Sequence, residues 1–396
     1  MIPILLLNNY FREVLMLKRI KTLLSVTLLL LVSTSFAAIT PTPKAPPVAA
    51  KSYILVDYAS GAILAEENSQ QRLPPASITK LMTAYVVSHE LDAGNISLSD
   101  EVLISEKAWR MVGSRSFIEV NSKVPVEALL RGMIIQSGND AAVALAEHIA
   151  GSEETFSQMM NQYAQQLGMV NTNYRNATGL PDQDHYTTAQ DIATLSAAVI
   201  RDFPDHYAWY AEKEYTYNNI TQHNRNKLLW RDSSVDGLKT GHTEEAGYCL
   251  AASAERSGMR LISVVLGTKS ENARAQEIQK LLNYGFRFFE THDLYQASTK
   301  IADSKVWKGA TDLVDLGLAE SLAITVPRGR YKELVATTNI NQPIIAPITA
   351  GTQLGEVEIH LADTLVAKQP LVVLQAIEQG SWWRRILDSI LLLIWG

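Results

Sequence analysis

The stretch PPASITK, residues 74–80, is followed directly by the apolar run LMTAYVV, residues 81–87. Two prolines cannot continue a preceding helix, so this pattern predicts that a helix begins here. Ser77 and Lys80 are three residues apart and would share one helical face. A hydroxyl beside an amine at a helix N-terminus is what a nucleophile and its base require, and the unpaired N–H groups there can stabilise an oxyanion. The alternative is a solvated serine and lysine in an ordinary first turn.

Two further motifs follow in order along the chain. Ser137-Gly138-Asn139 connects two helix-like segments, 124–136 and 141–149, and Lys239-Thr240-Gly241 ends a strand-like segment. Ser-x-x-Lys, Ser-x-Asn and Lys-Thr-Gly in this order are typical of enzymes that are acylated on serine, the β-lactamases and penicillin-binding proteins. A second Ser-x-Asn, at 270–272, comes after Lys-Thr-Gly and is therefore in the wrong order.

The composition excludes several other classes of function. The formal net charge is −6 and no basic stripe is present, which argues against nucleic-acid binding. The single cysteine, Cys249, excludes an internal disulfide, and its apolar neighbours predict a buried thiol. The 8 histidines contain no His-x-x-x-His pair, so we expect neither a metal site nor a cofactor.

The N-terminal 37 residues indicate export. Residues 18–37 have a basic start, an apolar stretch at 23–32 and a small-x-small site before Ala38, as in a secretory signal peptide. A membrane-spanning anchor is the alternative, but the apolar stretch is short and contains polar residues. Residues 1–15 match no part of a signal, so we expect the natural start at Met16. Residues 38–50 are rich in proline and predict a spacer without a fixed fold.

The other end of the chain, residues 381–396, predicts an amphipathic helix. A helical projection gives one broad apolar face and an opposite polar face with paired arginines, and the segment is too short to span a bilayer. With its tryptophans it fits a helix that lies in the membrane surface. The alternative is a terminal helix docked on its own core. The apolar face comprises Trp382, Ile386, Leu387, Ile390, Leu391, Leu393 and Ile394.

The segments between the two ends predict two folded domains. From 51 to 291, strand patterns at the beginning and end enclose a helical middle, which indicates an α+β domain with one antiparallel sheet and helices packed on it. From 292 to 380, short β-branched runs alternate with turn residues and predict a small all-β domain. Expected strands are 52–64 (a hairpin), 235–240, 248–254, 260–266, 322–326, 333–338, 355–360 and 370–374; further expected helices are 154–167, 188–200 and 272–289.

From about Ser52 to its end, the sequence resembles the low-molecular-mass penicillin-binding proteins, the D-alanyl-D-alanine carboxypeptidases. Beyond the three motifs, the stretches QSGND (136–140), NRN (224–226), DGLKTGHT (236–243) and YGFRFFE (284–290) are similar to that family. The resemblance implies a penicillin-recognising, serine β-lactamase/DD-peptidase-like domain whose active site lies between the sheet and the helical part. A β-rich domain and an amphipathic anchor at the periplasmic face of the inner membrane also belong to this pattern.

Chemistry and resemblance together suggest a role for each motif residue in the catalytic step. Ser77 would attack the carbonyl between two terminal D-alanines of a peptidoglycan stem peptide and form an acyl-enzyme. Lys80 must be neutral to take the proton, and burial and the nearby Lys239 would both disfavour its charged form. Ser137 would pass a proton to the leaving amine, while Asn139 would hold Lys80 and the substrate amide.

The remaining candidates would bind substrate. Lys239 and Thr240 suit the free carboxylate, and Gly241 lets a substrate backbone approach the strand. The resemblance implies that the backbone N–H groups of Ser77 and His242 form the oxyanion hole. Two arginines, Arg225 and Arg274, fall where the family has basic residues near the site, and surface salt bridges are the alternative for both.

Three competing functions share these motifs. A class A β-lactamase needs a deacylating glutamate between Ser-x-Asn and Lys-Thr-Gly, and no glutamate occurs between Glu154 and Glu212. A β-lactam sensor or wall-binding module would keep Ser77 but release no D-alanine. An endopeptidase would cleave cross-links rather than free ends. The segment 107–123 is shorter than the corresponding loop in the best-known members of the family, which affects the expected peptide preference but not the motifs.

Overall fold

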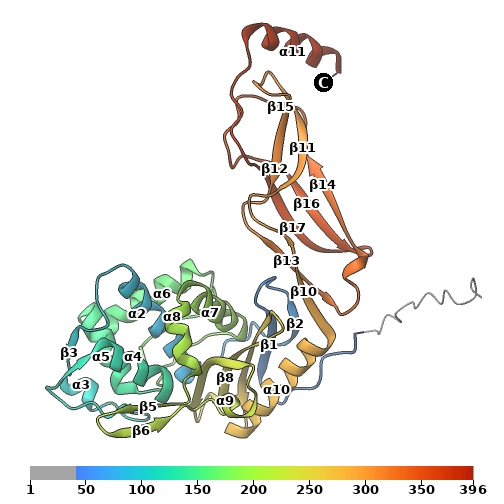
Figure 1. Cartoon of the computed structure of the whole chain (residues 1–396). Helices are drawn as coiled ribbons and strands as arrows, with labels where there is room; N and C mark the ends of the chain where they lie inside the picture. Colours follow the sequence, from blue (N-terminus) through green and yellow to red (C-terminus); the bar gives the residue numbers. More distant parts are fainter. Residues whose placement is uncertain (1–41, 396) are drawn as a thin grey trace, which may run out of the picture. The chain divides into compact units, whose positions relative to one another are not determined.

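A computed structural model describes residues 42–395, so the predicted signal peptide and the expected start at Met16 lie outside the described residues. Within the described part, the first domain is built on a five-stranded antiparallel sheet with the order β2-β1-β9-β8-β7 (Figure 1). The N-terminal hairpin therefore pairs with strands from the far end of the domain, as the sequence predicts. The strands are β1 (Ser52–Asp57), β2 (Ile63–Glu67), β7 (Val235–Thr243), β8 (Gly247–Arg256) and β9 (Met259–Thr268).

Helix α10 (Glu271–Phe288) covers one face of this sheet. The side chain of Ser270 caps its N-terminus by accepting from the backbone N–H of Ala273 at 3.1 Å. Its buried residues recur at helical spacing, and Gly285 lies so close to the sheet that an added Cβ would be 2.5 Å from the side chain of Leu261. This packing explains why a glycine occurs inside the helix.

The other face of the sheet is covered by α7 (Ala189–Asp202) and by the helical region that holds two of the motifs (Figure 1). The main helices here are α2 (Lys80–Asp92), α4 (Val126–Arg131), α5 (Asn139–Ala150) and α6 (Glu153–Gln166). Helix α2 is buried from Lys80 to Ser88, which makes it the central helix of this core. The other elements of the domain are η1 (Ala76–Thr79), β3 (Glu101–Leu103), α3 (Glu106–Trp109), β4 (Lys123–Pro125), η2 (Gly132–Gln136), α8 (Pro204–Tyr207), η3 (Ala208–Ala211), β5 (Glu214–Tyr217), β6 (Ile220–His223) and α9 (Leu228–Arg231).

The C-terminal domain is all-β, as expected. Strand β10 (Phe289–Tyr295) directly follows α10 and pairs with β13 (Leu322–Pro327). A six-stranded sheet has the order β14-β16-β17-β12-β11-β15, and its apolar residues form a separate core. Of the eight strands of this domain, the sequence predicted β13, β14, β16 and β17 and missed β10, β11, β12 and the two-residue β15. The sheet comprises β11 (Lys300–Trp307), β12 (Leu313–Gly317), β14 (Leu334–Ile340), β15 (Ile344–Ile345), β16 (Gln353–Leu361) and β17 (Thr364–Val373), with η4 (Tyr331–Glu333) before β14.

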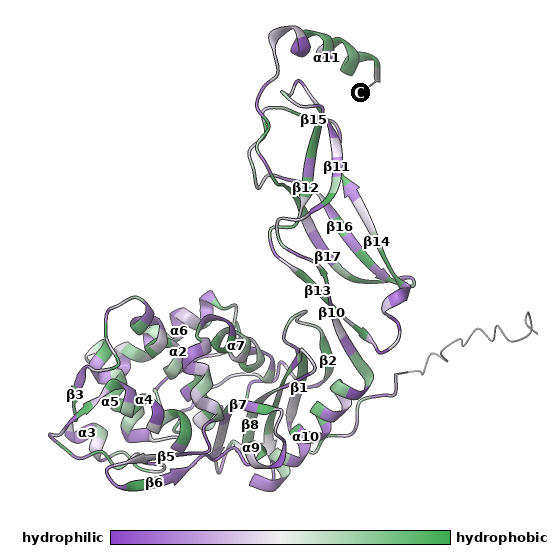
Figure 2. Cartoon of the chain, in the orientation of Figure 1, coloured by the Kyte–Doolittle hydropathy of each residue, from purple (hydrophilic) through white to green (hydrophobic). Residues whose placement is uncertain are grey.

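Helix α11 (Trp382–Trp395) follows the β domain, and Figure 2 shows that it is hydrophobic along most of its length. Its polar side faces the β domain: Asp388 accepts from the backbone N–H of Lys308, and the Arg384 guanidinium forms an ion pair with Asp312. Its large apolar side chains remain exposed, including Trp383 at 66% and Leu393 at 88%. The apolar face is therefore not docked on the protein's own core. None of the described helices has the length and hydropathy that a bilayer crossing requires.

The proline-rich spacer differs from the expectation. Residues 42–50 contain no helix or strand, but they lie against the core instead of being unstructured. Ala45 and Val48 pack on the cluster beneath α10, and the hydroxyl of Tyr284 donates to the carbonyl of Pro43 at 2.9 Å. Burial of these small apolar side chains explains the ordering, which a composition argument misses.

Candidate active site

Ser77 lies in the 3₁₀ turn η1, between Pro75 and the first residue of α2. The helix start predicted from the sequence is therefore present, with a tighter first turn than an α-helix. This turn packs against strand β7. An added Cβ on Gly241 of that strand would lie 2.9 Å from the Pro75 carbonyl oxygen and 3.2 Å from the Ala76 Cβ. Glycine at 241 thus allows the Lys-Thr-Gly strand to approach the nucleophile turn closely.

Lys80 is 1% exposed and connects all parts of the site. Its Nζ is 3.1 Å from Ser77 Oγ, 2.7 Å from Asn139 Oδ1 and 2.6 Å from the carbonyl oxygen of Thr178. The two shorter contacts are to oxygens that can only accept a hydrogen bond. A neutral amine has two protons for those acceptors, so its lone pair points at the Ser77 hydroxyl. In that neutral form the amine can accept the Ser77 proton.

Electrostatics favour this neutral form. Burial lowers the pKa of Lys80 from 10.5 to about 7; the charge of Arg225 lowers it further, against the opposing charges of Asp140 and Glu153. Lys239 is 2% exposed, and burial, with the charges of Lys80, Arg225 and Arg274, holds its pKa well below the usual value for lysine. Burial is the main cause, as expected from the sequence, whereas Lys239, the second expected cause, is not among the charges that act on the pKa of Lys80.

Ser137 follows the π-turn η2 in the left-handed conformation, with φ of 71°. It is 2% exposed, and its Oγ has no hydrogen-bond partner among the described residues. A buried hydroxyl without a partner at the edge of a cavity is suited to a group of a bound substrate. Asn139 is the first residue of α5, and its Nδ2 donates to the Val112 carbonyl at 2.6 Å, which orients Oδ1 toward Lys80.

Strand β7 is the edge strand of the sheet, and Thr240 and His242 line the cavity beside Ser77. The imidazole of His242 stacks on Tyr248 with ring centroids 3.8 Å apart, and its Nδ1 is 3.1 Å from the Gly247 carbonyl oxygen. Lys239 Nζ donates to the Thr240 carbonyl at 3.3 Å. Lys239 is buried next to Thr240 and does not line the cavity itself.

The two candidate arginines occupy different places. Arg225 is exposed and lines the cavity. Arg274 is 4% exposed, donates to the Gly241 carbonyl at 3.2 Å and lies over the Tyr248 ring at 5.7 Å. It therefore holds strand β7 through the Gly241 carbonyl, and it neither lines the cavity nor forms a surface salt bridge.

These residues enclose a cavity of about 310 Å³. A larger cavity of about 720 Å³ lies near the end of α10 and contains none of the motif residues. Size alone would select the wrong cavity, whereas the chemistry of the lining selects the smaller one. Its lining consists of Ser77, Gly113, Ser114, Ser137, Asn139, Thr178, Gly179, Leu180, Arg225, Thr240, His242 and Thr243. The described residues contain no group of three or more His, Cys, Asp or Glu side chains arranged to hold a metal ion.

Sequence reasoning missed two supporting residues. Asp140 is fully buried and accepts from the backbone N–H of Ser116 at 2.8 Å, from that of Ala141 at 2.9 Å and, more weakly, from that of Ile118 at 3.4 Å. It thereby holds the segment that contributes Gly113 and Ser114 to the cavity. An aspartate directly after Ser-x-Asn was available as a signal. Thr178 acts through its backbone carbonyl, for which residue type gives no signal.

A serine with a desolvated lysine base, an unpartnered second serine and a lysine-bearing edge strand define the class of penicillin-recognising, serine-acylating enzymes. Comparison with known proteins agrees. Residues 39–270 match the peptidase S11 family model, described as D-alanyl-D-alanine carboxypeptidase, and residues 289–379 match the penicillin-binding protein 5 C-terminal domain. The chain belongs to the D-alanyl-D-alanine carboxypeptidase family of serine peptidases, and it is a hydrolase of that class.

Relatives match over nearly the whole chain. The D-alanyl-D-alanine carboxypeptidase DacC of Escherichia coli K12 is 43% identical over 376 residues, which cover 93% of this chain and 94% of that protein. DacA of the same strain is 43% identical over 359 residues, 89% of each protein. The crystal structure of penicillin binding protein 5 from Haemophilus influenzae has a TM-score of 0.83 and 43% identity and covers 85% of this chain and 100% of that chain. The predicted fold class and family are confirmed.

Proposed function

We propose that the protein removes the terminal D-alanine from peptidoglycan stem pentapeptides through an acyl-enzyme on Ser77. One observation carries the assignment of the nucleophile: Lys80 Nζ lies 3.1 Å from Ser77 Oγ, while its other two partners are oxygens that can only accept. No other arrangement of the amine's protons satisfies both acceptors and leaves a lone pair for a proton.

Acylation begins when the Ser77 hydroxyl gives its proton to the neutral Lys80. The Ser77 oxygen forms a bond to the carbonyl carbon between the two D-alanines, and backbone N–H groups of Ser77 and His242 stabilise the developing oxyanion. The C–N bond then breaks, and the leaving amine takes a proton through the hydroxyl of Ser137. Water, activated by the same lysine, hydrolyses the ester and restores the serine.

Substrate lies extended along the edge strand β7. An unpaired strand edge offers backbone hydrogen bonds to a peptide, and the small Gly241 leaves room for its backbone. The hydroxyl of Thr240 and the guanidinium of Arg225 bind the free carboxylate. A carboxylate bound at this place orients the D-Ala-D-Ala end for attack by Ser77.

β-Lactams acylate Ser77 by the same route, because their ring amide and carboxylate mimic the D-Ala-D-Ala end. A structural relative, penicillin-binding protein D2 from Listeria monocytogenes, is known in an ampicillin-bound form; its TM-score is 0.57 and its identity 30%. No glutamate lines the cavity around Ser77. The carboxylate of Glu153, which influences Lys80, is instead bonded to Lys107 and to the backbone N–H of Ala177. Without a carboxylate to activate water, release of the antibiotic is slow.

The enzyme acts on the outer side of the cytoplasmic membrane, exported by its N-terminal signal and held at the surface by α11. The polar side of α11 is bonded to the β domain while its apolar face is exposed. Exposed tryptophans and aliphatic side chains beside paired arginines suit the interface of an anionic bilayer. The association is peripheral.

Release of D-alanine from a peptide ending in D-Ala-D-Ala tests this function, with Ser77→Ala as the comparison. We expect release that the variant abolishes, and little cleavage of a cross-linked muropeptide without a free D-Ala-D-Ala end. Cleavage of the cross-link at the same rate would identify an endopeptidase. Penicillin labelling of Ser77 without release from either substrate would identify a sensor.

A further inference from the structure

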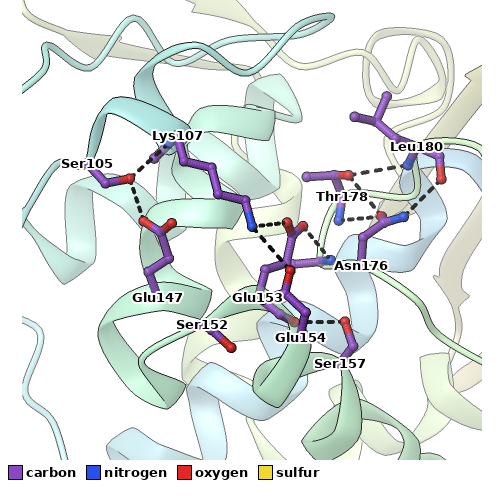
Figure 3. Close-up of polar contacts among 12 residues, drawn as sticks. Ser105, Lys107, Glu147, Ser152, Glu153, Glu154, Ser157, Asn176, Thr178 and Leu180 are labelled. Carbon is purple, nitrogen blue, oxygen red and sulfur yellow. Dashed lines mark hydrogen bonds and ion pairs between the residues drawn. The ribbon is translucent and has the colours of Figure 1, made fainter.

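Glu153 lies outside the cavity and is connected to Lys80 through the Ala177–Thr178 segment. It is the first residue of α6, after the cap residue Ser152, and it is 9% exposed. Its Oε1 accepts from the backbone N–H of Ala177 at 3.1 Å, and its Oε2 is 3.0 Å from Lys107 Nζ. Figure 3 shows the carboxylate between the lysine on one side and the segment with Asn176 and Thr178 on the other.

The segment that Glu153 holds is a tight, buried turn. Asn176 Oδ1 accepts from the backbone N–H groups of Thr178 at 3.2 Å and Gly179 at 2.7 Å, and its Nδ2 donates to the Leu180 carbonyl at 3.0 Å (Figure 3). These bonds fix the shape of the turn but not its place. Its place is set by Glu153 on one side and by α2 on the other, where Thr83 Oγ1 donates to the Ala177 carbonyl at 2.7 Å.

This turn touches both the base and the nucleophile. The Thr178 carbonyl accepts from Lys80 Nζ at 2.6 Å, the shortest of the lysine's three contacts. Gly179 lies against the nucleophile turn so closely that an added Cβ would be 1.8 Å from the Ala76 carbonyl oxygen. A shift of the turn would therefore redirect the Lys80 amine and disturb the turn that carries Ser77.

We propose that Glu153, held by Lys107, is a positioning residue for acylation: it fixes the Ala177–Thr178 turn so that the Thr178 carbonyl keeps the Lys80 amine directed at Ser77. The inference rests on the proposed role of Lys80 as the base. Glu153 touches neither the cavity nor the substrate, so its effect on the reaction passes through the turn and through its charge.

The charge supplies a readout that a purely structural role would not give. Burial is the main cause that lowers the pKa of Lys80, and the carboxylate of Glu153 opposes it. The charged group that pairs with this carboxylate, Lys107, is 46% exposed. Removal of the Glu153 charge should therefore lower the pKa of Lys80, and removal of the Lys107 charge should raise it. The other charged groups that act on the pKa of Lys80 are Asp140 and Arg225, and Lys80 in turn lowers the pKa values of Lys239 and His185.

The experiment measures the second-order rate constant for acylation by a fluorescent penicillin, from pH 5 to 9, on the full chain. Glu153→Gln keeps an oxygen for the Ala177 N–H but removes the charge. The acidic limb of the pH–rate profile, where the rate falls as Lys80 becomes protonated, should therefore move about half a pH unit lower. At pH 5.5 the rate constant should then be about threefold higher than in the wild type. Lys107→Gln should move the limb higher by a smaller amount, because Lys107 is partly solvated. The double variant should fall between the two.

Glu153→Ala removes the acceptor as well and should lower the plateau rate at high pH by about tenfold, through the displaced turn, while its acidic limb shifts as in Glu153→Gln. Glu154→Gln is the matched control, because Glu154 is 77% exposed and lies 3.7 Å from the same Lys107 without touching the turn; its profile should match the wild type. Melting curves of all variants identify any that fail to fold, and the opposite shifts of the two Gln variants do not depend on Glu153→Ala.

Limbs that stay at the wild-type pH in both Gln variants, or a wild-type rate in folded Glu153→Ala, would overturn the proposal. A different result would contradict the proposed function itself. In that case the rate of the wild-type protein would not fall at low pH, or Ser77→Ala would still be labelled.

Discussion

The lowered pKa of Lys80 predicts how acylation depends on pH. The active form of the base is the neutral amine, so the rate is full above the pKa and is lost as the pH falls through it. With a pKa of about 7, the neutral fraction is about a half at pH 7, a tenth at pH 6 and a hundredth at pH 5. An ordinary lysine would instead give a rate that still rises tenfold per unit between pH 7 and 9.

A single substitution tests the cause of the shift. Arg225 lowers the pKa of Lys80, so Arg225→Gln should raise it and move the acidic limb toward higher pH. Because Arg225 is exposed, solvent screens the effect, and we expect about half a pH unit or less. Lys227→Gln is the matched control: Lys227 is a neighbouring cation that is 46% exposed and pairs with Glu271.

The assay is labelling by a fluorescent penicillin under pseudo-first-order conditions, with the midpoint of the limb read separately from its plateau. Arg225→Gln also weakens carboxylate binding and lowers the plateau, but only the midpoint reports on Lys80. A rate independent of pH between 5 and 9, or one that still climbs at pH 9, would refute the reasoning for the base. An unmoved midpoint in Arg225→Gln would refute the assigned cause.

Three further predictions concern support of the site and the membrane. Gly241→Ala places a methyl group 2.9 Å from the Pro75 carbonyl and should slow penicillin acylation by about 10- to 100-fold in a protein that still melts cooperatively; an unchanged rate would show that β7 tolerates the displacement. Asp140→Ala leaves buried N–H groups without an acceptor and should cost about 3 kcal/mol, seen as a melting temperature several degrees lower, whereas an unaltered melting curve would contradict the role of Asp140. Removal of residues 381–396 should abolish co-sedimentation with phosphatidylglycerol vesicles and leave D-alanine release from a short peptide unchanged; retained sedimentation would argue for another anchor.

The sequence predicted the parts of the fold that depend on periodicity and short motifs. The five-stranded sheet, the long helix at its face and the two motif helices follow from apolar spacing and turn residues. Strands β11 and β12 were missed because their apolar alternation is interrupted: Ser304 and Gly317 occupy buried positions, while Leu313 is exposed. The spacer at 42–50 was expected to be unstructured, yet it packs, since composition does not show which core lies nearby.

For the site, the sequence identified the residues that act through side chains in known motifs. It did not identify groups that act through the backbone or from a distance, such as the Thr178 carbonyl and the carboxylate of Glu153. It also grouped Arg274 with the substrate-binding residues, whereas in the structure this side chain bonds the Gly241 carbonyl and does not line the cavity. The position of a residue in the sequence does not show which part of a strand its side chain contacts in the folded protein.

The central claim is that Ser77 carries the acyl group during turnover. The most direct measurement is mass spectrometry of the protein quenched in acid during turnover of a depsipeptide that ends in D-Ala-D-lactate, whose good leaving group lets the acyl-enzyme accumulate. The account predicts an acyl adduct on the peptide that contains Ser77, absent in Ser77→Ala. An adduct on another residue, or continued hydrolysis by Ser77→Ala, would contradict it.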